Sequence, residues 1–353
     1  MGTLKVLVTG ATGMVGFHVV KGMLALGHEV VAVIRKSSDD RDLNALKGRL
    51  LIKRCELDDE AGLRSALNGV DVVLHSAGIV DPHARREDVF AVNVEATKSL
   101  LIAADAANVK HFIHVSSLSV ITQGDLHGAN EELPLVYCGE AYADSKVDAE
   151  KAVCMFFGRT SMYATILRPG FIYGPKEKAW MPRLIENLRT GRAMLIDGGI
   201  KQTNVIYVDN FVNAVRLAML NPKADKQVFN LTDGEIVTKK ELFDAICDGM
   251  GYKRIEREVP GWLAKAACET VSIVAPYLPL ETRKKLSRFS RAAFRLAGVN
   301  QGFDISKAEN QLGYKERIPF GEGMRITLEY FKGETGAAGR TQAEKAAAHR
   351  PGQ

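Results

Sequence analysis

The first half of the chain alternates short apolar runs with longer segments in which apolar residues recur at helical spacing. The short runs are rich in Val, Ile and Leu, as strands buried on both faces of a sheet are. Repeated strand–helix–strand units predict a parallel sheet covered by helices on both sides. The expected strands cover residues 5–8, 30–34, 50–53, 70–75 and 111–115, and the expected helices cover residues 14–26, 60–67, 89–107 and 141–157.

The pattern changes after about residue 171. Segments 164–167 and 205–208 still look like strands of the same sheet, but the pieces between and after them are helical and richer in Pro and Gly. We therefore expect an α/β fold in which a doubly wound parallel sheet carries a smaller, mostly helical lobe. The main domain is assigned to 1–170 plus 195–231, the lobe to 171–194 plus 232–332, and a disordered tail to 333–353, which lacks apolar periodicity.

Composition excludes several classes of protein. The 353 residues are 46% apolar and 25% charged, which excludes a disordered or fibrous chain. The five cysteines are an odd number without a close pair, so neither a disulfide framework nor a zinc ribbon is expected, and a reducing compartment fits. The N-terminus does not look like a signal peptide, and no stretch of about 20 residues lacks charge. We therefore expect a cytoplasmic protein without a membrane-spanning helix.

The net charge of +5 is unevenly distributed along the chain. Residues 282–303 hold six basic residues and no acidic one, which leaves a net charge of −1 for the rest. So small a surplus does not predict nucleic-acid binding. His111 and His114 have no Cys or carboxylate companion in their strand, so no metal site is expected.

A glycine-rich segment, T-G-A-T-G-M-V-G over residues 9–16, directly follows the first strand and opens the first helix. Glycines there permit a tight turn and let backbone N–H groups approach a pyrophosphate, which the positive end of the helix also attracts. A plain strand–helix turn is the alternative. The placement favours dinucleotide binding, and the expected contacts are Gly10, Thr12, Gly13, Met14 and Val15.

The end of the second strand bears on the choice of cofactor. An acidic residue at this place would accept hydrogen bonds from an NAD ribose, whereas a 2′-phosphate requires positive charge. Arg35 occupies the place, followed by Lys36 and Ser37. This favours NADP(H), and NAD(H) stays open because Arg35 could merely stack on the adenine.

Two further strand ends face the same cofactor. Leu57 and Asp58 follow the third strand and are expected to cover the adenine edge, although Asp58 could instead cap the next helix. Ser76, Ala77 and Gly78 end the fourth strand with small side chains, where the cofactor must cross the sheet closely.

A third group of residues indicates the reaction. Ser116 and Ser117 follow a strand, and Tyr142 and Lys146 lie four apart at the start of a helix, on one face. An ammonium near a phenol stabilises the phenolate and lowers its pKa from about 10. The phenol can then exchange a proton with a substrate hydroxyl or carbonyl while a hydride moves to or from nicotinamide. Tyr137 is the nearest rival phenol, but it has no lysine four residues on.

These motifs, with the runs over 93–97 and 167–175, resemble the extended short-chain dehydrogenases/reductases, in the right order from residue 4 to about 332. The resemblance implies that Tyr142 is the catalytic acid/base, that Lys146 also holds the nicotinamide ribose, and that Ser117 positions the substrate. Ser117 is preferred to Ser116 because it lies three residues before Val120, as in family members. The further cofactor contacts that the resemblance implies are Asn93, Val115, Pro169 and Ile172.

Within that family, residues 205–219, 259–263 and 311–314 are similar to the 3β-hydroxysteroid dehydrogenase branch, which includes sterol-4-carboxylate 3-dehydrogenases. The resemblance implies oxidation or reduction of a secondary alcohol or ketone on a bulky apolar substrate of steroid or terpenoid type. Sugar-nucleotide epimerases and dehydratases are the rival within the fold. They usually carry an Arg-Asp pair just before the strand that starts here at Val205, where this chain has Gln202, Thr203 and Asn204 and lacks the arginine. A non-catalytic NADP-sensing regulator is the rival from another class, and it normally loses the Tyr or the Lys.

The lobe also raises questions of substrate and partner. Trp180, Met181 and Trp262 could line an apolar pocket or simply belong to the core. Residues 281–296 predict a basic amphipathic helix with Lys284, Arg288, Arg291 and Arg295 on one face, directly after an apolar segment over 259–280. Such a helix could lie on an anionic membrane surface, or it could pack on the lobe with its charges in water. A homodimer also stays open.

Overall fold

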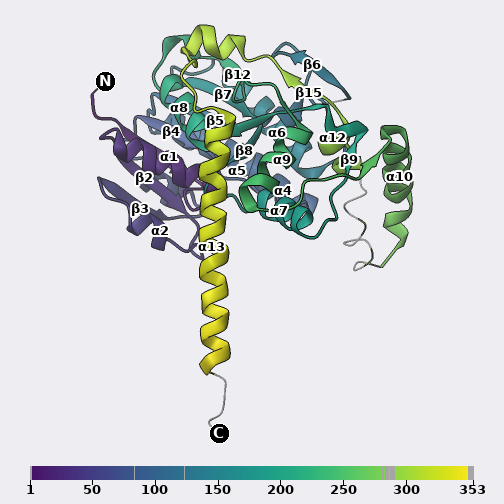
Figure 1. Ribbon diagram of the computed structural model, residues 1–353. Helices are drawn as coiled ribbons and strands as arrows, with labels where there is room; N and C mark the ends of the chain where they lie inside the picture. The colour runs from purple at the N-terminus through teal and green to yellow at the C-terminus, as the bar shows by residue number, and fades with distance from the viewer. Residues whose placement is uncertain are drawn as a thin grey trace.

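The computed structural model describes residues 2–348 except 83, 123, 280, 281, 283–285 and 287–290. Its main layer is a seven-stranded sheet in the order β12-β7-β5-β4-β1-β2-β3 (Figure 1), and every pairing within it is parallel. The expected doubly wound fold is confirmed. The seven strands are β1 (Lys5–Thr9), β2 (Glu29–Ile34), β3 (Leu50–Arg54), β4 (Val72–His75), β5 (His111–Val115), β7 (Tyr163–Pro169) and β12 (Gln227–Leu231).

Helices cover both faces of this sheet because successive strand residues point to opposite sides. On one face Val8 packs with Val19 and Phe211, and on the other Leu7 packs with Leu63 and Leu100. The helices of this layer are α1 (Met14–Ala25), α2 (Arg41–Asn44), α3 (Glu60–Ala66), α4 (Arg86–Phe90), α5 (Ala96–Ala106), α6 (Ala141–Cys154) and α8 (Val208–Ala218).

The helix expected over 89–107 is interrupted. α4 passes into a π-helical turn, η1 (Ala91–Glu95), before α5 begins at Ala96. Such turns occur frequently at functional sites, and Asn93 lies within this one.

The strand expected over 205–208 is not part of the main sheet. β11 (Val205–Tyr207) pairs with β8 (Phe171–Tyr173) in a separate two-stranded sheet, and β12 completes the main sheet beside β7. Both segments are short, so periodicity alone could not assign either to a sheet. The remaining strand pairs are β6 (Leu126–Ala129) with β15 (Gln301–Phe303), β9 (Leu195–Ile196) with β14 (Glu258–Val259), and β10 (Gln202–Thr203) with β13 (Val237–Thr238).

The lobe has its own apolar cluster, in which Met181 and Ile246 pack with Phe320 and Leu328. The cluster also takes in Tyr207, whereas residues 305–314 pack against the main sheet. The lobe helices are α7 (Met181–Arg189), α9 (Lys239–Met250), α10 (Gly261–Val274), α12 (Arg291–Gly298) and α13 (Phe320–Ala348), and the short helical turns are η2 (Leu118–Val120), η3 (Asp197–Gly199), η4 (Pro222–Ala224), η5 (Ala275–Tyr277) and η7 (Ala308–Leu312). The amphipathic helix expected over 281–296 lies largely outside the described residues, and only its end is described, as α12.

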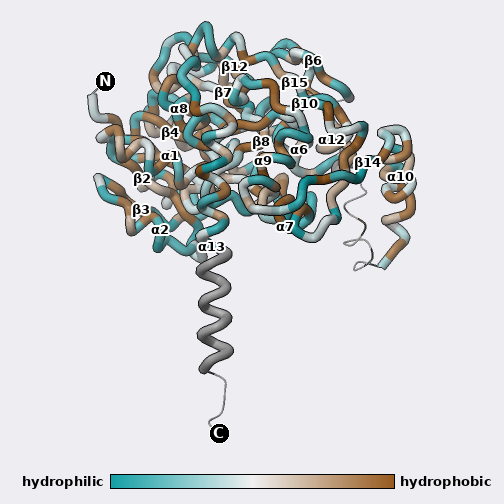
Figure 2. Tube along the Cα trace, viewed as in Figure 1, coloured by the Kyte–Doolittle hydropathy of each residue, from teal (hydrophilic) through white to brown (hydrophobic). Residues whose placement is uncertain are grey.

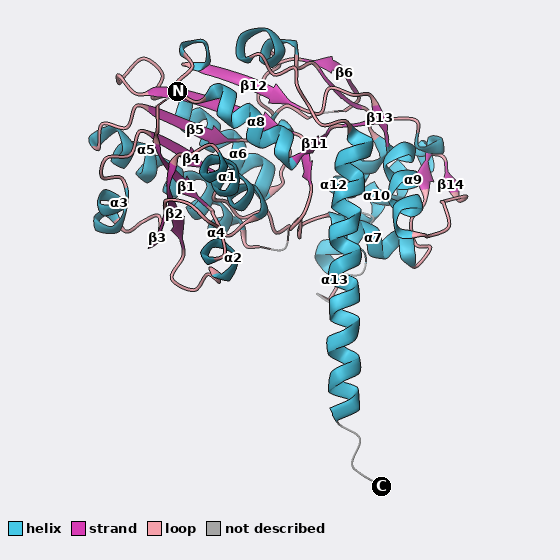
Figure 3. Ribbon diagram, turned by 60° about the vertical axis from the view of Figure 1, so that its left-hand side comes forward, coloured by secondary structure: helices cyan, strands magenta, loops and turns pink. Residues whose placement is uncertain are grey.

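Helix α13 differs from the expected disordered tail. Its first turns pack on the lobe through Met324, Leu328 and Phe331, and the helix then continues to Ala348 as a rod leading away from the body (Figures 1 and 3). Residues 333–348 include six alanines, the strongest helix formers, against three glycines that disfavour helix, and the last ten of them contain no glycine after Gly339. Because the docked turns already supply the nucleus, extension needs only this local preference. None of the helices in the described residues is sufficiently long and apolar to cross a membrane.

Candidate functional site

The glycine turn after β1 is shaped for close approach. Gly10 has φ +67°, and a Cβ there would lie 2.9 Å from the backbone nitrogen of Ala77. The backbone N–H of Gly13 donates to the carbonyl of Gly10 at 2.9 Å, and α1 then begins at Met14 without a side-chain cap and without an acidic residue in its first turn. The N–H groups at the start of α1, including those of Met14 and Val15, are therefore suited to an anion such as a pyrophosphate.

The end of β4 is tied to this turn by hydrogen bonds. The hydroxyl of Ser76 donates to the carbonyl of Thr9 at 2.7 Å, and the N–H of Ala77 donates to the hydroxyl of Thr9 at 3.2 Å. His75 lies 2.8 Å from the Thr9 hydroxyl, and burial lowers the pKa of His75 to about 3, so its ring is neutral. These contacts hold the two strand ends in register where a dinucleotide would cross them.

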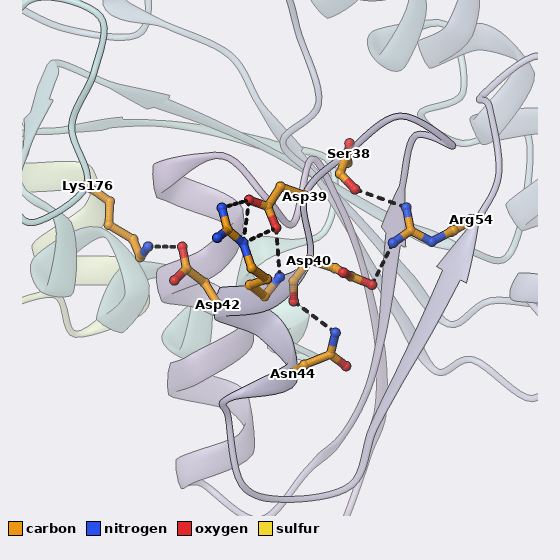
Figure 4. A network of polar contacts seen from close by, with 8 residues as sticks. Ser38, Asp39, Asp40, Asp42, Asn44, Arg54 and Lys176 are labelled. Atoms are coloured by element: carbon orange, nitrogen blue, oxygen red, sulfur yellow. Dashed lines mark hydrogen bonds and ion pairs between the residues drawn. The ribbon is translucent and has the colours of Figure 1, made fainter. Parts of the chain in front are cut away.

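Cations crowd the end of β2, and Figure 4 shows how they pair. Arg41 binds Asp39 at 2.6 Å, Arg54 binds Asp40 at 2.7 Å, and Lys176 binds Asp42. The hydrogen bonds from Arg41 lower the pKa of Asp39 to about 2, so this carboxylate stays ionised.

Arg35 stands apart from this network. Among the described residues no carboxylate pairs with it, and its side chain is exposed. Its guanidinium is therefore available for an anion that arrives from solution, as a 2′-phosphate would.

The residues after β3 differ in part from expectation. Leu57 is half-buried against the apolar layer, and Asp58 is exposed. The cap of α3 is Asp59, whose carboxylate accepts the N–H of Gly62 at 2.9 Å. Asp58 is therefore not the helix cap; a run of neighbouring acidic residues does not reveal from sequence which of them has the extended backbone that a cap requires.

Ser117, Tyr142 and Lys146 meet at the carboxyl end of β5. Lys146 is 95% buried, and its ammonium donates to the carbonyl of Val115 at 2.8 Å and lies 6.0 Å from the ring centroid of Tyr142. Tyr142 as a residue is half-buried, and its phenol hydrogen-bonds with Ser117.

The electrostatics of this cluster differ from expectation. Burial raises the pKa of Tyr142, and the hydrogen bond with Ser117 offsets only part of this rise. Burial also lowers the pKa of Lys146 to about 8, against the opposing charge of Glu150. The lowered pKa expected for Tyr142 is therefore wrong for the protein's own groups, because desolvation outweighs an ammonium that does not touch the phenol.

A buried ion pair lies beneath the cluster, and the sequence did not indicate it. Glu150 accepts the hydroxyl of Ser116 at 2.8 Å and pairs with Arg168, whose Nε lies 3.1 Å from both carboxylate oxygens. The hydroxyl of Ser116 is thereby engaged, which supports Ser117 as the serine that faces a substrate. The spacing of Glu150, four residues after Lys146, was the available signal.

The remaining expected cofactor contacts are Asn93, Pro169 and Ile172. Asn93 accepts the N–H of Ile79 at 2.7 Å and donates to Ser145 at 2.9 Å, so it joins the β4 loop to α6. Pro169 ends β7 and is buried, and Ile172 follows in β8, half-buried. The structure brings these residues to the same end of the sheet as Val115.

The aromatic and sulfur residues of the lobe separate into two groups. Met181 is fully buried, and Trp180 packs beside it with its indole N–H donating to the carbonyl of Ile172 at 3.1 Å. Both belong to the lobe core. Trp262 is instead 74% exposed.

Tyr137, unlike the expectation, forms a contact with a lysine. The ammonium of Lys151 donates to its phenolic oxygen at 2.8 Å, and Tyr137 itself donates to Asp148. Tyr137 has no lysine four residues further on, but the fold brings Lys151 of α6 to its phenol.

The described residues contain no group of three or more His, Cys, Asp or Glu side chains that could hold a metal ion. His111 is engaged with the hydroxyl of Thr165 at 2.8 Å and with the N–H of Leu220 at 3.0 Å.

Comparison with known proteins identifies a family whose model matches most of the chain. The model of the 3-beta hydroxysteroid dehydrogenase/isomerase family matches residues 7–254. The 3-beta-hydroxysteroid dehydrogenase of Mycolicibacterium neoaurum is 29% identical over 344 residues, 93% of this chain and 91% of the relative. The 4-hydroxy-2-methyl-3-oxo-4-farnesyl-3,4-dihydroquinoline-1-oxide ketoreductase of Stigmatella aurantiaca is 27% identical, over 91% of this chain and 95% of the relative.

Two further comparisons concern length and fold. The 3beta-hydroxysteroid-dehydrogenase/decarboxylase isoform 2 of Arabidopsis thaliana is 24% identical over 92% of this chain, which spans only 61% of that relative. Among solved structures, the dTDP-glucose 4,6-dehydratase DesIV of Streptomyces venezuelae with NAD and TYD bound superposes with a TM-score of 0.75 at 22% identity, covering 94% of this chain and 98% of that one. This likeness concerns the fold alone.

Proposed function

Because this chain belongs to the 3-beta hydroxysteroid dehydrogenase/isomerase family, we propose that it moves a hydride between a nicotinamide dinucleotide and a secondary alcohol or ketone of a bulky apolar substrate, of steroid or terpenoid type. The observation that carries the proposal is the meeting of Ser117, Tyr142 and Lys146 beside the glycine turn. We assign the dinucleotide to residues 1–170 plus 195–231 and the substrate to the lobe, 171–194 plus 232–332.

The bound nicotinamide supplies or accepts the hydride. In the reductive direction Tyr142 gives its phenolic proton to the substrate oxygen, and in the oxidative direction it takes that proton back. The hydroxyl of Ser117 hydrogen-bonds the same oxygen and fixes it beside the phenol. Lys146, held by the carbonyl of Val115 at 2.8 Å, places a positive charge near the phenolate as it forms, and it would hold the nicotinamide ribose of a bound cofactor.

The residues near β10 argue against a sugar nucleotide as substrate. Thr203 and Asn204 are buried and uncharged where a diphosphate would need a cation. A cavity of about 240 Å³ beside them is lined by Glu235, Asp304 and Glu309 and by no basic residue. Carboxylates at that place would repel a nucleotide diphosphate.

For the cofactor, the proposal favours NADP(H) over NAD(H). Arg35 is exposed at the end of β2 and has no carboxylate partner among the described residues, whereas Arg41 and Arg54 are each paired. A 2′-phosphate would give Arg35 an anionic partner, which the described residues do not supply.

The test is a turnover assay that follows NADPH absorbance. Apolar ketones, namely 3-ketosteroids and farnesylated ketones, should be reduced, while UDP-glucose and dTDP-glucose should neither react nor raise the melting temperature. A ligand that binds only the folded chain, at a hundred times its Kd, adds about 2.7 kcal/mol of stability, so the thermal measurement is sensitive. Stabilisation by a nucleotide sugar without ketone reduction would favour the epimerase or dehydratase alternative instead.

A further inference from the structure

A network of buried hydrogen bonds joins the glycine turn to the start of α6. It runs through the side chains of Thr9, His75, Thr97, Asn93 and Ser145 and ends on the carbonyl of Tyr142, and we call it the Thr9–Tyr142 network. These five residues are each at most 1% exposed. The strands around them are largely hydrophobic (Figure 2), so their polar atoms depend on one another for partners.

The first half of the network fixes the ring of His75. Thr97 donates its hydroxyl proton to the carbonyl of Asn93 at 2.8 Å, so its oxygen accepts the Nε2–H of His75, 2.8 Å away. Burial lowers the pKa of His75 to about 3, so the ring is neutral, and its Nδ1 therefore accepts the hydroxyl of Thr9 at 2.8 Å. The oxygen of Thr9 in turn accepts the N–H of Ala77 at 3.2 Å.

The second half of the network reaches Tyr142. The amide of Asn93 donates to the hydroxyl of Ser145 at 2.9 Å, and Ser145 donates to the carbonyl of Tyr142 at 2.7 Å. Every hydroxyl of the network therefore accepts one hydrogen bond and donates another, all in the same direction. Shifting one member would leave a buried donor or acceptor without a partner, which is costly, so the network holds its members in one arrangement.

The two ends of the network belong to the two halves of the proposed site. Thr9 directly precedes Gly10 of the glycine turn, where the dinucleotide is expected. Tyr142, at the other end, carries the phenol that hydrogen-bonds with Ser117. Hydride and proton transfer need both halves in register, and a misplacement of about 1 Å can cost about 10²-fold in rate. A rigid connection between the two ends therefore bears on turnover.

The same sheet contains a second histidine with the same type of bonding at another place. His111 is buried, its pKa is lowered to about 4 by burial, and its Nε2 lies 2.8 Å from the hydroxyl of Thr165. Thr165 donates to the carbonyl of Ala224 at 2.6 Å, and the Nδ1 of His111 accepts the N–H of Leu220 at 3.0 Å. His111 begins β5, about 13 Å from the carboxyl end of that strand at Val115. It therefore offers a matched control away from the site.

We propose that His75 and Thr97 are positioning residues that hold the glycine turn and Tyr142 in the alignment that hydride transfer requires. This role rests on the proposed function, because the alignment matters only if the chain binds a dinucleotide and carries out that reaction. The alternative is that the network stabilises the fold alone, as we expect of the bonds around His111.

The first experiment compares Thr97→Val with Thr165→Val. Each removes one buried hydroxyl that accepts from a histidine and donates to a backbone carbonyl, so both should lower the melting temperature by a similar amount. At saturating NADPH, Thr97→Val should lower kcat for ketone reduction by about 10–100-fold while KM for the ketone and Kd for NADPH stay near the wild-type values. Thr165→Val should turn over like the wild type. Thr97→Ser, which keeps the hydroxyl, should restore kcat.

The second experiment needs no turnover. Amide hydrogen exchange over residues 143–147, at the start of α6, is measured with and without NADPH. NADPH should slow this exchange in the wild type and in Thr165→Val, and Thr97→Val should lose this effect although its glycine turn stays protected. Ser145→Ala breaks the network at its other end and should reproduce both losses, so the test does not depend on the folding of Thr97→Val.

Two results would overturn the positioning role. They are equal losses of kcat in Thr97→Val and Thr165→Val, and wild-type kcat and exchange in Thr97→Val or Ser145→Ala. Failure of the proposed function looks different. A wild type in which NADPH slows exchange in α6 but which reduces no ketone contradicts the proposed reaction alone. A wild type that binds neither NADPH nor NADH contradicts the proposed function, and the positioning role falls with it.

Discussion

Helix α6 organises two tyrosine–lysine pairs, and they differ in their surroundings. Tyr142 and Lys146 lie at the carboxyl end of the sheet, where Lys146 is buried and its pKa is lowered to about 8. Tyr137 and Lys151 lie in solvent, and the hydrogen bond with Tyr137 raises the pKa of Lys151. The second pair even has the closer contact, 2.8 Å between Nζ and the phenolic oxygen. A short distance between a lysine and a phenol therefore does not by itself indicate a catalytic site, and the buried pair is the one for which we propose catalysis.

Removing each lysine in turn should give the largest difference in activity between the two pairs. Lys146→Met should lower kcat/KM by about 10²–10³-fold, the range for loss of one preorganised electrostatic group, and should weaken cofactor binding. Lys151→Met should leave both unchanged, because its ammonium is on the surface. Steady-state rates and NADPH fluorescence titration measure the two effects. Similar losses of kcat/KM in both variants would contradict a catalytic role that is confined to the buried pair.

Arg35 is an exposed cation that no carboxylate of the described residues pairs with, and it offers a second comparison. Arg35→Asp should shift the preference from NADP(H) toward NAD(H) by about 10–100-fold, since it replaces a charge-assisted hydrogen bond with repulsion. The control Arg41→Gln removes a cation that Asp39 already holds, and it should change the preference little. The ratio of kcat/KM values for the two cofactors is the measurement. A wild type that already prefers NAD(H) several-fold would contradict the role given to Arg35.

The pH dependence of turnover tests the charge of Lys146. Lys146 has its pKa lowered from 10.5 to about 8, so above pH 8 it loses the charge that supports the phenolate. Turnover should therefore fall about tenfold per pH unit above this value, and Lys146→Arg, which stays charged, should not show this limb. Because the unfolded chain binds this proton more tightly, Lys146 makes folding more favourable as pH rises from 8 to 10.5. A flat wild-type profile above pH 8 would exclude a required Lys146 charge.

The parts of the fold that the sequence predicts well are those with local signals. The glycine turn, β1, β2 and β5 are each marked by residues within a few positions, and the structure has them where expected. β11 and β12 could not be placed, because the sheet that takes up a three- to five-residue strand is decided by packing of distant segments. The extension of α13 was not predicted because it depends on the first turns of the helix. Those turns are held by packing on the lobe, which a local sequence pattern does not reveal.

The candidate site divides in the same way. Tyr142 and Lys146 are recognisable from their spacing, and their catalytic role stays a prediction. Glu150, Arg168 and Lys151 act through contacts between elements, so no local pattern reveals their partners. The direction of the Tyr142 pKa could not be predicted either, because burial depends on the whole fold and here outweighs the nearby ammonium.

The most direct test of the central claim compares two single-atom deletions in one assay. Tyr142→Phe and Tyr137→Phe each remove only a phenolic oxygen from a tyrosine associated with α6. With an apolar ketone and NADPH, Tyr142→Phe should lose about 10²–10⁴-fold in turnover, the usual contribution of a general acid, while its NADPH affinity stays that of the wild type. Tyr137→Phe should match the wild type in both. Near-wild-type turnover by Tyr142→Phe, or an equal loss in Tyr137→Phe, would contradict the account.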